Sequence, residues 1–128
     1  MDIKLRNLIL LIVGVLIIVG VVFYFLWAQQ SGPNKLDAFA KCISAKGAKF
    51  YGAFWCPHCQ DQKSLFGSAK QYLPYVECST ADSNGQLQVC IDQKIKVYPT
   101  WKFADGSTQE GEMSLADLAT KTGCVVPQ

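Results

Sequence analysis

The chain opens with an unbroken apolar run. Residues 8–27 (LILLIVGVLIIVGVVFYFLW) contain no charged side chain. At about 1.5 Å per residue, a helix of this length spans the roughly 30 Å hydrocarbon layer of a bilayer. Lys4 and Arg6 precede the run, and no charge follows it before Lys35. The positive-inside rule therefore predicts a single membrane-spanning helix with a cytoplasmic N-terminus and an extracytoplasmic remainder.

This apolar run could be a cleaved signal peptide or a retained anchor. Signal peptides usually carry an apolar region of about 7–15 residues that ends at a small-x-small site. The stretch FLWAQQSG offers no clear site of this kind, and aromatic side chains cluster at Phe23, Tyr24, Phe25 and Trp27, where interfacial anchors occur. The sequence therefore favours an N-terminus and retained anchor in residues 1–28, a short polar linker at 29–33, and an exported domain at 34–128.

After residue 34 the pattern changes to short apolar segments separated by turn residues. It predicts helices and strands at about 34–46 (helix), 49–55 (strand), 56–72 (helix), 74–78 (strand), 86–94 (helix) and 114–123 (helix). Asp105-Gly106 is a hairpin signal between two further strands. Asn34 and Ser114 are the expected helix caps, and an interruption is expected near Gly67. This order of elements predicts an α/β sandwich.

Composition narrows the possible partners. The chain has 12 Lys and Arg against 10 Asp and Glu, and its formal net charge is +2. Because the basic residues form no cluster, nucleic acid is not an expected partner. The six cysteines are expected to lie in a generally oxidising compartment, where they pair unless chemistry keeps some of them free.

Two cysteines stand two residues apart in the stretch FYGAFWCPHCQ. A zinc site would need a second C-x-x-C or a pair of histidines, and haem attachment needs C-x-x-C-H, whereas Gln60 follows Cys59. A disulfide that only staples so short a loop would add little stability. Neither a metal nor a cofactor is expected, and a redox role accounts best for the spacing.

The redox interpretation gives each residue of the motif a role. Trp55 ends the preceding strand, and Pro57 suits the first helical turn because its φ is fixed and it has no N–H. The helix dipole stabilises a thiolate, so Cys56 is the expected exposed nucleophile and Cys59 the resolving thiol. His58 is either an inert surface residue or a donor of a hydrogen bond or partial positive charge toward Cys56, and the second role is favoured.

Two motifs resemble the thioredoxin superfamily: WCPHC after a strand, and YPT at Tyr98, Pro99 and Thr100. In that family the proline is cis and lies against the redox cysteines, and the backbone of the preceding residue pairs with substrate. The resemblance implies a thioredoxin-like fold, a central mixed sheet flanked by helices. It also implies a catalytic role for Pro99 and a substrate site at Trp55, Tyr98 and Thr100.

A closer similarity is to the thioredoxin-like domain that is fused to, or partnered with, bacterial homologues of vitamin K epoxide reductase. It covers about residues 36–123 and rests on the segments KGAKFYGAFWCPHCQDQKSLFG, LPYVECS, QLQVC, YPTW and SLADLATKTG. It implies that a quinone-reducing membrane partner reoxidises this domain, which passes its disulfide to reduced exported proteins. That partner is expected to be a separate protein or a part of the gene product outside this sequence.

The residue at position 50 and the four cysteines outside the CPHC motif bear on the direction of electron flow and on the disulfides. Reducing thioredoxins carry a buried aspartate six residues before the first cysteine, where this chain has Phe50, so the proton acceptor that helps Cys59 act as a reductant is absent and the reductase interpretation is weakened. The resemblance also implies that Cys78 and Cys90 form a structural disulfide. Cys42 and Cys124 remain, and elimination pairs them, which would join the first helix of the domain to its C-terminal end.

The combined prediction is a membrane-anchored thiol-disulfide oxidoreductase that acts as a dithiol oxidase for exported proteins. Two alternatives stay open. One is an anchored reductase, in which electrons flow the other way. The other is a non-catalytic module that holds clients in the groove beside Pro99, against which the intact CPHC motif argues.

Overall fold

A computed structural model describes residues 2–29 and 34–128 of the chain. They belong to two compact units, with a boundary between Pro33 and Asn34. Of the linker expected at 29–33, Gln29 is the last residue of a helix, and the other positions lie outside the described residues. Each unit is described by itself below.

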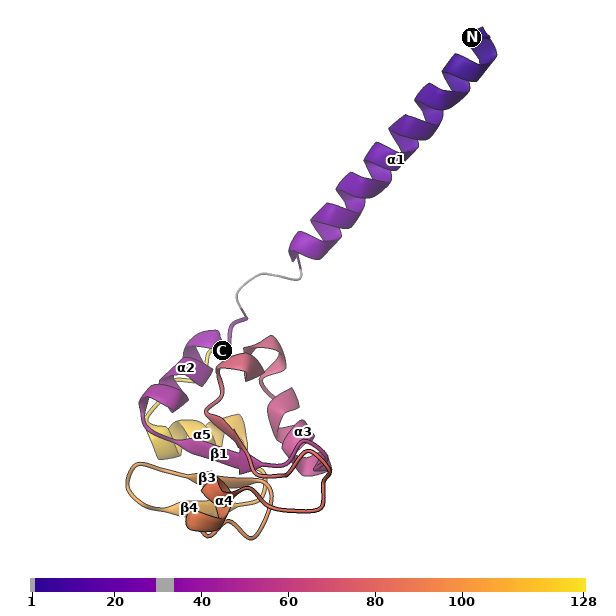
Figure 1. The fold of residues 1–128 in the computed structure, drawn as a ribbon. Coiled ribbons are helices and arrows are strands. Elements are labelled where there is room, and N and C mark those ends of the chain that lie inside the picture. Colours follow the sequence, from indigo (N-terminus) through magenta and orange to yellow (C-terminus); the bar gives the residue numbers. More distant parts are fainter. Residues whose placement is uncertain (1, 30–33) are drawn as a thin grey trace. The chain divides into compact units, whose positions relative to one another are not determined.

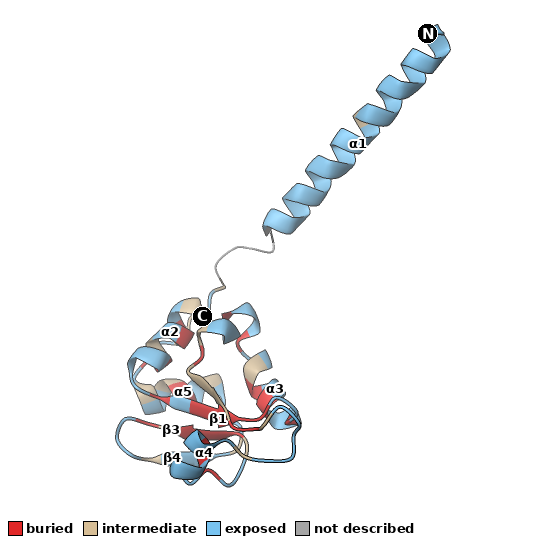
Figure 2. Ribbon diagram, viewed as in Figure 1, coloured by how far each residue is buried: buried red, intermediate tan, exposed pale blue. Residues whose placement is uncertain are grey.

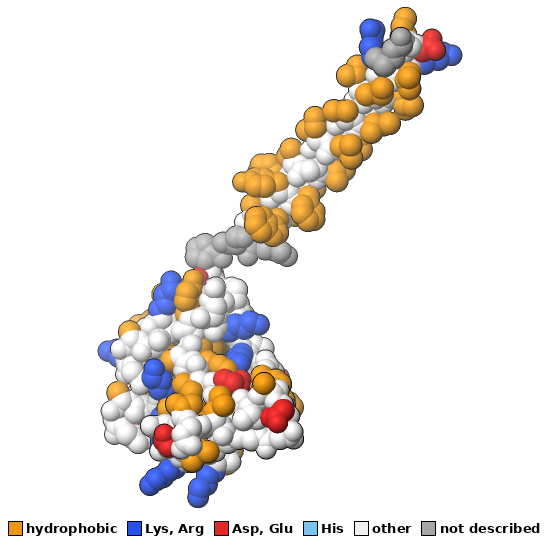
Figure 3. Space-filling view, viewed as in Figure 1, with side chains coloured by type: hydrophobic (Ala, Val, Ile, Leu, Met, Phe, Trp, Pro, Cys, Tyr) orange, Lys and Arg blue, Asp and Glu red, His pale blue; other side chains and the backbone are white. Residues whose placement is uncertain are grey.

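The N-terminal unit is one helix, α1 (Ile3–Gln29). Its length and mean hydropathy of 3.2 suit a membrane span, and none of its most apolar window is buried. Figures 2 and 3 show a helix exposed along its length, with apolar side chains on its surface and charged ones near its N-terminal end. Such a helix can serve as a membrane anchor or as a signal sequence.

The second unit is built on a four-stranded mixed sheet with strand order β2-β1-β3-β4. The strands are β1 (Lys49–Gly52), β2 (Tyr75–Glu77), β3 (Thr100–Lys102) and β4 (Thr108–Glu110). Strand β1 runs parallel to β2, with Phe50 opposite Tyr75, and antiparallel to β3, with Phe50 opposite Trp101. Strand β4 returns antiparallel to β3 through the Asp105-Gly106 turn, as the hairpin signal predicted.

Helices flank this sheet (Figure 1), which confirms the predicted architecture. They are α2 (Asp37–Ala45), α3 (Pro57–Ser64), the 3-10 helix η1 (Gly67–Tyr72), α4 (Gln88–Asp92) and α5 (Leu115–Thr122). Successive residues of β1 face opposite sides, so Phe50 joins the larger apolar core with side chains of α2, η1 and α5. Tyr51 joins a smaller core with Cys78, Cys90 and Ile95 beside α4.

Aromatic rings fill the larger core. Phe50 stacks on Trp101 with ring centroids 4.8 Å apart and meets the edge of Tyr75 at 5.2 Å. Phe39 of α2 stacks on Phe66 at 5.9 Å. Four of these five rings are almost completely buried, and Tyr75 lies at the margin of the core. Phe50 lies six residues before Cys56, and its ring is part of the packed core. This point of the core therefore holds no carboxylate.

Two disulfides connect distant parts of this unit. Cys42 of α2 is bonded to Cys124, with Cα atoms 6.0 Å apart, so the first helix is tied to the segment after α5. Cys78, directly after β2, is bonded to Cys90 of α4, with Cα atoms 5.5 Å apart. These are the two pairs that elimination and family resemblance suggested.

Two boundaries differ from the sequence prediction, and the predicted interruption near Gly67 is confirmed. Asn34 does not cap α2: the helix begins at Asp37, and the Asn34 side chain accepts the N–H of Leu36 and donates to the Phe66 carbonyl. The first strand ends at Gly52 and not at Trp55, because the chain turns there toward α3. The long second helix is divided into α3 and η1 at Gly67, whose φ of +54° breaks the helix as expected.

Candidate redox site

Cys56 lies at the N-cap of α3, between the turn that follows β1 and the first helical residue, Pro57. Its sulfur accepts a hydrogen bond from the Cys59 backbone N–H at 3.3 Å. At a helix N-terminus this N–H would otherwise lack a partner, and it offers positive charge to the sulfur. Of the six cysteines, Cys56 and Cys59 are the two that form no disulfide.

Both sulfurs are enclosed. Cys59 is completely buried, and only 5% of Cys56 is exposed, so the prediction of an exposed nucleophile was wrong. The Tyr98 carbonyl accepts the Cys56 thiol at 3.8 Å and belongs to the segment that covers the sulfur. Because this segment is 42 residues away along the chain, local sequence could not reveal the cover.

The covering segment contains a cis peptide bond between Tyr98 and Pro99. Pro99 is buried, and its carbonyl accepts the N–H of Gly111 at 2.8 Å, which holds the segment to the chain beyond β4. Thr100 is also buried, and its hydroxyl donates to the Val97 carbonyl at 2.7 Å. The Thr100 side chain therefore faces inward, and its contact with substrate stays a prediction.

An apolar rim surrounds the enclosed sulfur. Phe54 and Trp55 are 47% and 50% exposed, which is unusual for large aromatic side chains in a small domain. The Trp55 indole N–H donates to the Ser79 hydroxyl at 2.8 Å, and its ring meets Tyr98 edge-on with centroids 6.1 Å apart. These contacts fix the rim and leave apolar surface available beside Cys56.

His58 is paired with Glu112 and not with the Cys56 sulfur. Its Nδ1 lies 2.6 Å from Oε1 of Glu112, in the loop between β4 and α5, and the His58 side chain is 71% exposed. Among the described residues, this is the hydrogen bond that His58 makes, so the expected bond to Cys56 is absent. Glu112 stands 54 residues from His58, and sequence spacing gave no signal of the pair.

Comparison with known proteins now identifies the domain. Residues 34–122 match the model of the thioredoxin family. The chain belongs to the thioredoxin family. The enclosed Cys56–Cys59 pair, at a helix N-terminus and opposite a cis proline, lies within the matched segment.

Two known proteins are similar in sequence to this thioredoxin-family chain. "Thiol-disulfide oxidoreductase LTO1" of Arabidopsis thaliana is 43% identical over 105 residues, which are 79% of this chain and 27% of that protein. "Thioredoxin domain-containing protein 5 homolog" of Drosophila melanogaster is 31% identical over 109 residues, 71% of this chain and 25% of that protein. The chain therefore spans about a quarter of the length of these relatives.

A charged group that the sequence analysis missed lies between α3 and β2 of this thioredoxin-family domain. The ammonium nitrogen of Lys63 is 3.4 Å from the centroid of the Tyr75 ring, and the Tyr75 hydroxyl donates to Glu77 Oε2 at 2.8 Å.

Burial raises the pKa of the Cys59 thiol to about 12, with a further contribution from its hydrogen bond with Cys56. Burial also lowers the pKa of Lys63. One local signal was available, because Lys63 follows Cys59 at the i,i+4 spacing.

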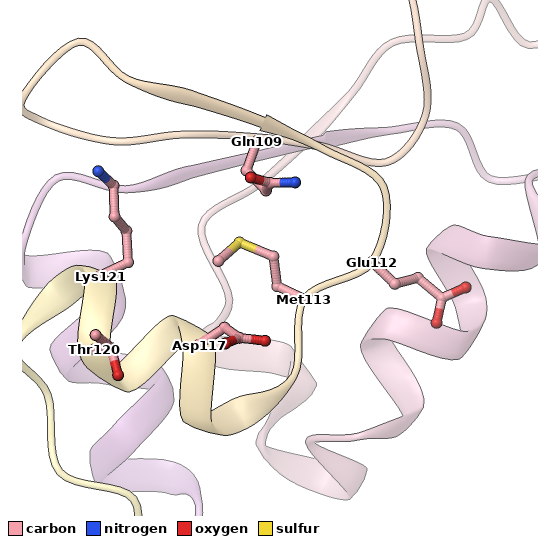
Figure 4. Close-up of a pocket in the computed structure, with 6 residues that line it drawn as sticks. All are labelled: Gln109, Glu112, Met113, Asp117, Thr120 and Lys121. Atoms are coloured by element: carbon pink, nitrogen blue, oxygen red, sulfur yellow. The ribbon is translucent and has the colours of Figure 1, made fainter.

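The surface beside His58 offers ligand atoms for a metal. His58, Asp61 and Glu112 each bring one such atom, all within 4.8 Å of one another, and all three residues are exposed. Glu112 also lies at the edge of a pocket of about 540 Å³ between β4 and α5. Figure 4 shows Met113 inside this pocket and Glu112 directed toward α3. Exposed groups of this kind are common without a metal.

Gln62 connects α3 to the loop before α5. Its side chain is completely buried. The amide oxygen accepts the Met113 backbone N–H at 2.7 Å and the Trp101 indole N–H at 3.2 Å, and the amide nitrogen donates to the Met113 carbonyl at 2.9 Å. The helix that begins at the redox motif is therefore fixed to the core by three hydrogen bonds of one buried side chain.

Proposed function

We propose that the protein is a membrane-anchored thiol-disulfide oxidoreductase that oxidises dithiols of exported proteins. The observation that carries this proposal is the Cys56 sulfur at the N-terminus of α3, 3.3 Å from the Cys59 amide nitrogen and covered by the segment with the cis Pro99. The relative from Arabidopsis thaliana, whose name is that of a thiol-disulfide oxidoreductase, supports the reaction class.

The exchange follows from the two different sulfurs. In the oxidised domain, a client thiolate attacks the sulfur of Cys56, a client–Cys56 bond forms, and Cys59 leaves as a thiolate. A second client thiolate then attacks the client sulfur of this mixed disulfide and displaces Cys56. The client gains a disulfide, and Cys56 and Cys59 keep two electrons and take up two protons. The apolar rim of Phe54 and Trp55 would hold an unfolded client near the bond.

The direction of electron flow rests on what stabilises the reduced pair. The helix N-terminus at Cys56 favours a sulfur that carries negative charge, which makes a disulfide more oxidising. Phe50 fills the position where reducing thioredoxins carry an aspartate, and its ring is stacked on Trp101. Both features support an oxidase.

The redox potential of the purified full-length chain in detergent tests this direction. Equilibration with glutathione buffers should give a value near about −120 mV for an oxidase, whereas a reductase would lie near about −270 mV. A value at the reducing end would assign the domain to the anchored reductases. A binding module would be indicated if Cys56→Ala kept full function in cells.

The proposal includes an electron acceptor in the membrane. We expect α1 to be a retained anchor with a cytoplasmic N-terminus, which would keep the domain close to integral membrane proteins and raise their effective concentration. The proposed partner is a quinone-linked protein similar to vitamin K epoxide reductase. It would meet the rim of the site at Phe54, Trp55, Pro57, His58 and the Tyr98-Pro99 edge.

Co-expression tests this coupling. With such a partner and quinone present, alkylation of free thiols in cells should find Cys56 and Cys59 oxidised, and without the partner it should find them reduced. A pair that stays reduced with the partner, or is equally oxidised without it, would contradict the coupling. The redox potential measured on the isolated protein would be unaffected by either result.

A further inference from the structure

Lys63 lies on the same face of α3 as Cys59, one helical turn later. Its ammonium group lies over the face of the Tyr75 ring, 3.4 Å from the centroid, a distance at which the negative face of an aromatic ring attracts a cation. Lys63 is half-buried, so this charge is partly shielded from solvent. The arrangement holds a positive charge between α3 and β2.

The Tyr75 ring also borders the Cys59 sulfur. A Cβ atom added to Gly52 of β1 would lie 2.8 Å from the Cys59 sulfur and 3.0 Å from Cε2 of Tyr75. The sulfur and the ring edge therefore approach the same bare Cα. Lys63 thus contacts the aromatic ring that forms one wall of the Cys59 environment.

Glu77 fixes the hydroxyl end of the Tyr75 side chain. Its Oε2 accepts the Tyr75 hydroxyl at 2.8 Å, and its Oε1 accepts the backbone N–H groups of Phe54, Cys78 and Ser79 at 3.2, 3.1 and 2.8 Å. Four hydrogen bonds hold this carboxylate in place. The charged and titratable groups that act on Lys63 are Glu77, Cys59, Lys70 of η1 and Cys56. Of these, Lys70 is the one with the same sign of charge.

We propose that Lys63 is a positioning residue for Cys59, whose thiolate it stabilises during disulfide exchange. The inference rests on the proposed exchange between Cys56 and Cys59, and it holds for either direction of electron flow. When the Cys56–Cys59 bond is attacked, Cys59 leaves as a thiolate. When a Cys56 mixed disulfide is resolved, the Cys59 thiolate attacks Cys56 and the client sulfur leaves as a thiolate.

The burial of Cys59 makes its thiolate costly to form. Burial raises the pKa of the Cys59 thiol even though the Lys63 ammonium lowers it, so loss of this cation would make the thiolate rarer still. Glu77 holds Tyr75, and Tyr75 holds the Lys63 ammonium, so the positive charge has a fixed place near the sulfur. Phe50 supplies no carboxylate to accept the Cys59 proton, and the lysine acts by stabilising the ionised sulfur directly.

Resolution of a mixed disulfide with glutathione tests the role of Lys63. The reduced full-length chain in detergent is mixed with excess oxidised glutathione, quenched with acid, and analysed by mass spectrometry between pH 6 and 9. The first step forms the Cys56–glutathione bond and depends on glutathione concentration. The second step, in which Cys59 displaces glutathione, does not. The two rates are therefore separable in one experiment.

Lys63→Met should slow the second step about tenfold at each pH, because the loss of the cation shifts its pH profile upward by about one unit. The first step should change less than twofold. Lys63→Arg keeps the charge and should restore the wild-type profile, which a purely structural role of the lysine stem would not explain. Lys41→Met is the matched control, since the Lys41 ammonium lies 4.1 Å from the Tyr72 ring centroid, in a second cation–ring pair.

Two results would overturn the inference alone: a wild-type pH profile in Lys63→Met, or an equal shift in Lys41→Met. A different result would overturn the proposed function with it. That result is a wild-type chain in which glutathione is not attached to Cys56 or is not displaced by Cys59.

Discussion

At the residue scale, the two sulfurs of the site have different surroundings. Cys56 has a backbone N–H on one side, the Tyr98 carbonyl on another and an exposed aromatic rim beside it. Cys59 lies deeper and is completely buried. Cys56 is therefore the sulfur that a client would attack, and Cys59 would be reached through Cys56.

This difference predicts which cysteine variant captures clients. Cys59→Ala removes the resolving thiol, so mixed disulfides between Cys56 and exported proteins should accumulate. They would appear on non-reducing gels after thiols in the cells are alkylated, and would disappear on reduction. Cys56→Ala is the matched control and should capture nothing. Equal capture by both variants would contradict the assigned roles.

Replacement of Gln62 should lower stability without touching a sulfur. Gln62→Leu leaves the Met113 N–H and carbonyl and the Trp101 indole N–H without partners inside the core. Unsatisfied buried groups of this kind predict a decrease of about 2–4 kcal/mol in the free energy of unfolding, measured by urea denaturation. Gln60→Leu, at an exposed position whose amide donates to the Phe54 carbonyl, should change it by less than about 1 kcal/mol.

At the scale of elements, local signals predicted helix ends well where neighbouring residues determine them. Ser114 accepts the N–H of Asp117 at the start of α5, and Gly123 ends that helix with φ +72°, both as expected. Asn34 failed as a cap because its side chain bonds to η1, a partner more than thirty residues away. Strand β1 ends at Gly52 because the chain then turns, with the Cys56 N–H donating to the Ala53 carbonyl, and the apolar residues of this turn carry no turn signal.

The same contrast between local signals and distant contacts applies to the redox site. The motif itself predicted the place of Cys56 at the N-terminus of a helix and of Cys59 one turn later, since strand, Pro57 and helix are adjacent in sequence. The burial of Cys56 and the His58–Glu112 pair depend on segments more than forty residues away. These were beyond sequence reasoning because the fold, and not the spacing, brings them together.

The β3–β4 turn provides a pH-dependent contribution to stability. The Ser107 hydroxyl and the Lys121 ammonium donate to the Asp105 carboxylate, and they hold the pKa of Asp105 below its usual range. A depressed carboxyl pKa stabilises the fold above the unfolded value of about 3.9, and this stabilisation is lost as the pH falls through the folded value. Asp105 therefore supports the turn at neutral pH and less so in acid.

Thermal unfolding of the Asp105→Asn variant measures this contribution to stability. The variant should unfold at a lower temperature than wild type at pH 7, and the difference should shrink as the pH is lowered below about 4. Asp92→Asn removes a carboxylate from α4 and serves as the control, with no such convergence expected. A difference for Asp105→Asn that stays constant down to pH 2 would contradict the assignment.

At the scale of the whole molecule, an apolar helix and a domain with two free thiols belong to one chain. Protease added outside intact cells or spheroplasts should digest the domain and leave a short fragment containing α1 in the membrane fraction. This result is expected because Lys4 and Arg6 favour a cytoplasmic N-terminus. A protected domain would reverse the orientation, and a soluble exported form that begins near Gln29 would identify α1 as a signal peptide.

The Cys42–Cys124 bond joins positions 82 residues apart and makes the backbone between them a closed ring, which contains all four strands and both redox cysteines. Tension between the two ends of this domain would run across the sulfur–sulfur bond and stretch only the segments outside the ring. A domain pulled by its two ends in this way would keep its sheet folded under load. In a single-molecule pulling experiment, reduction of that one bond would release the length of the ring apart from the loop that Cys78–Cys90 still closes.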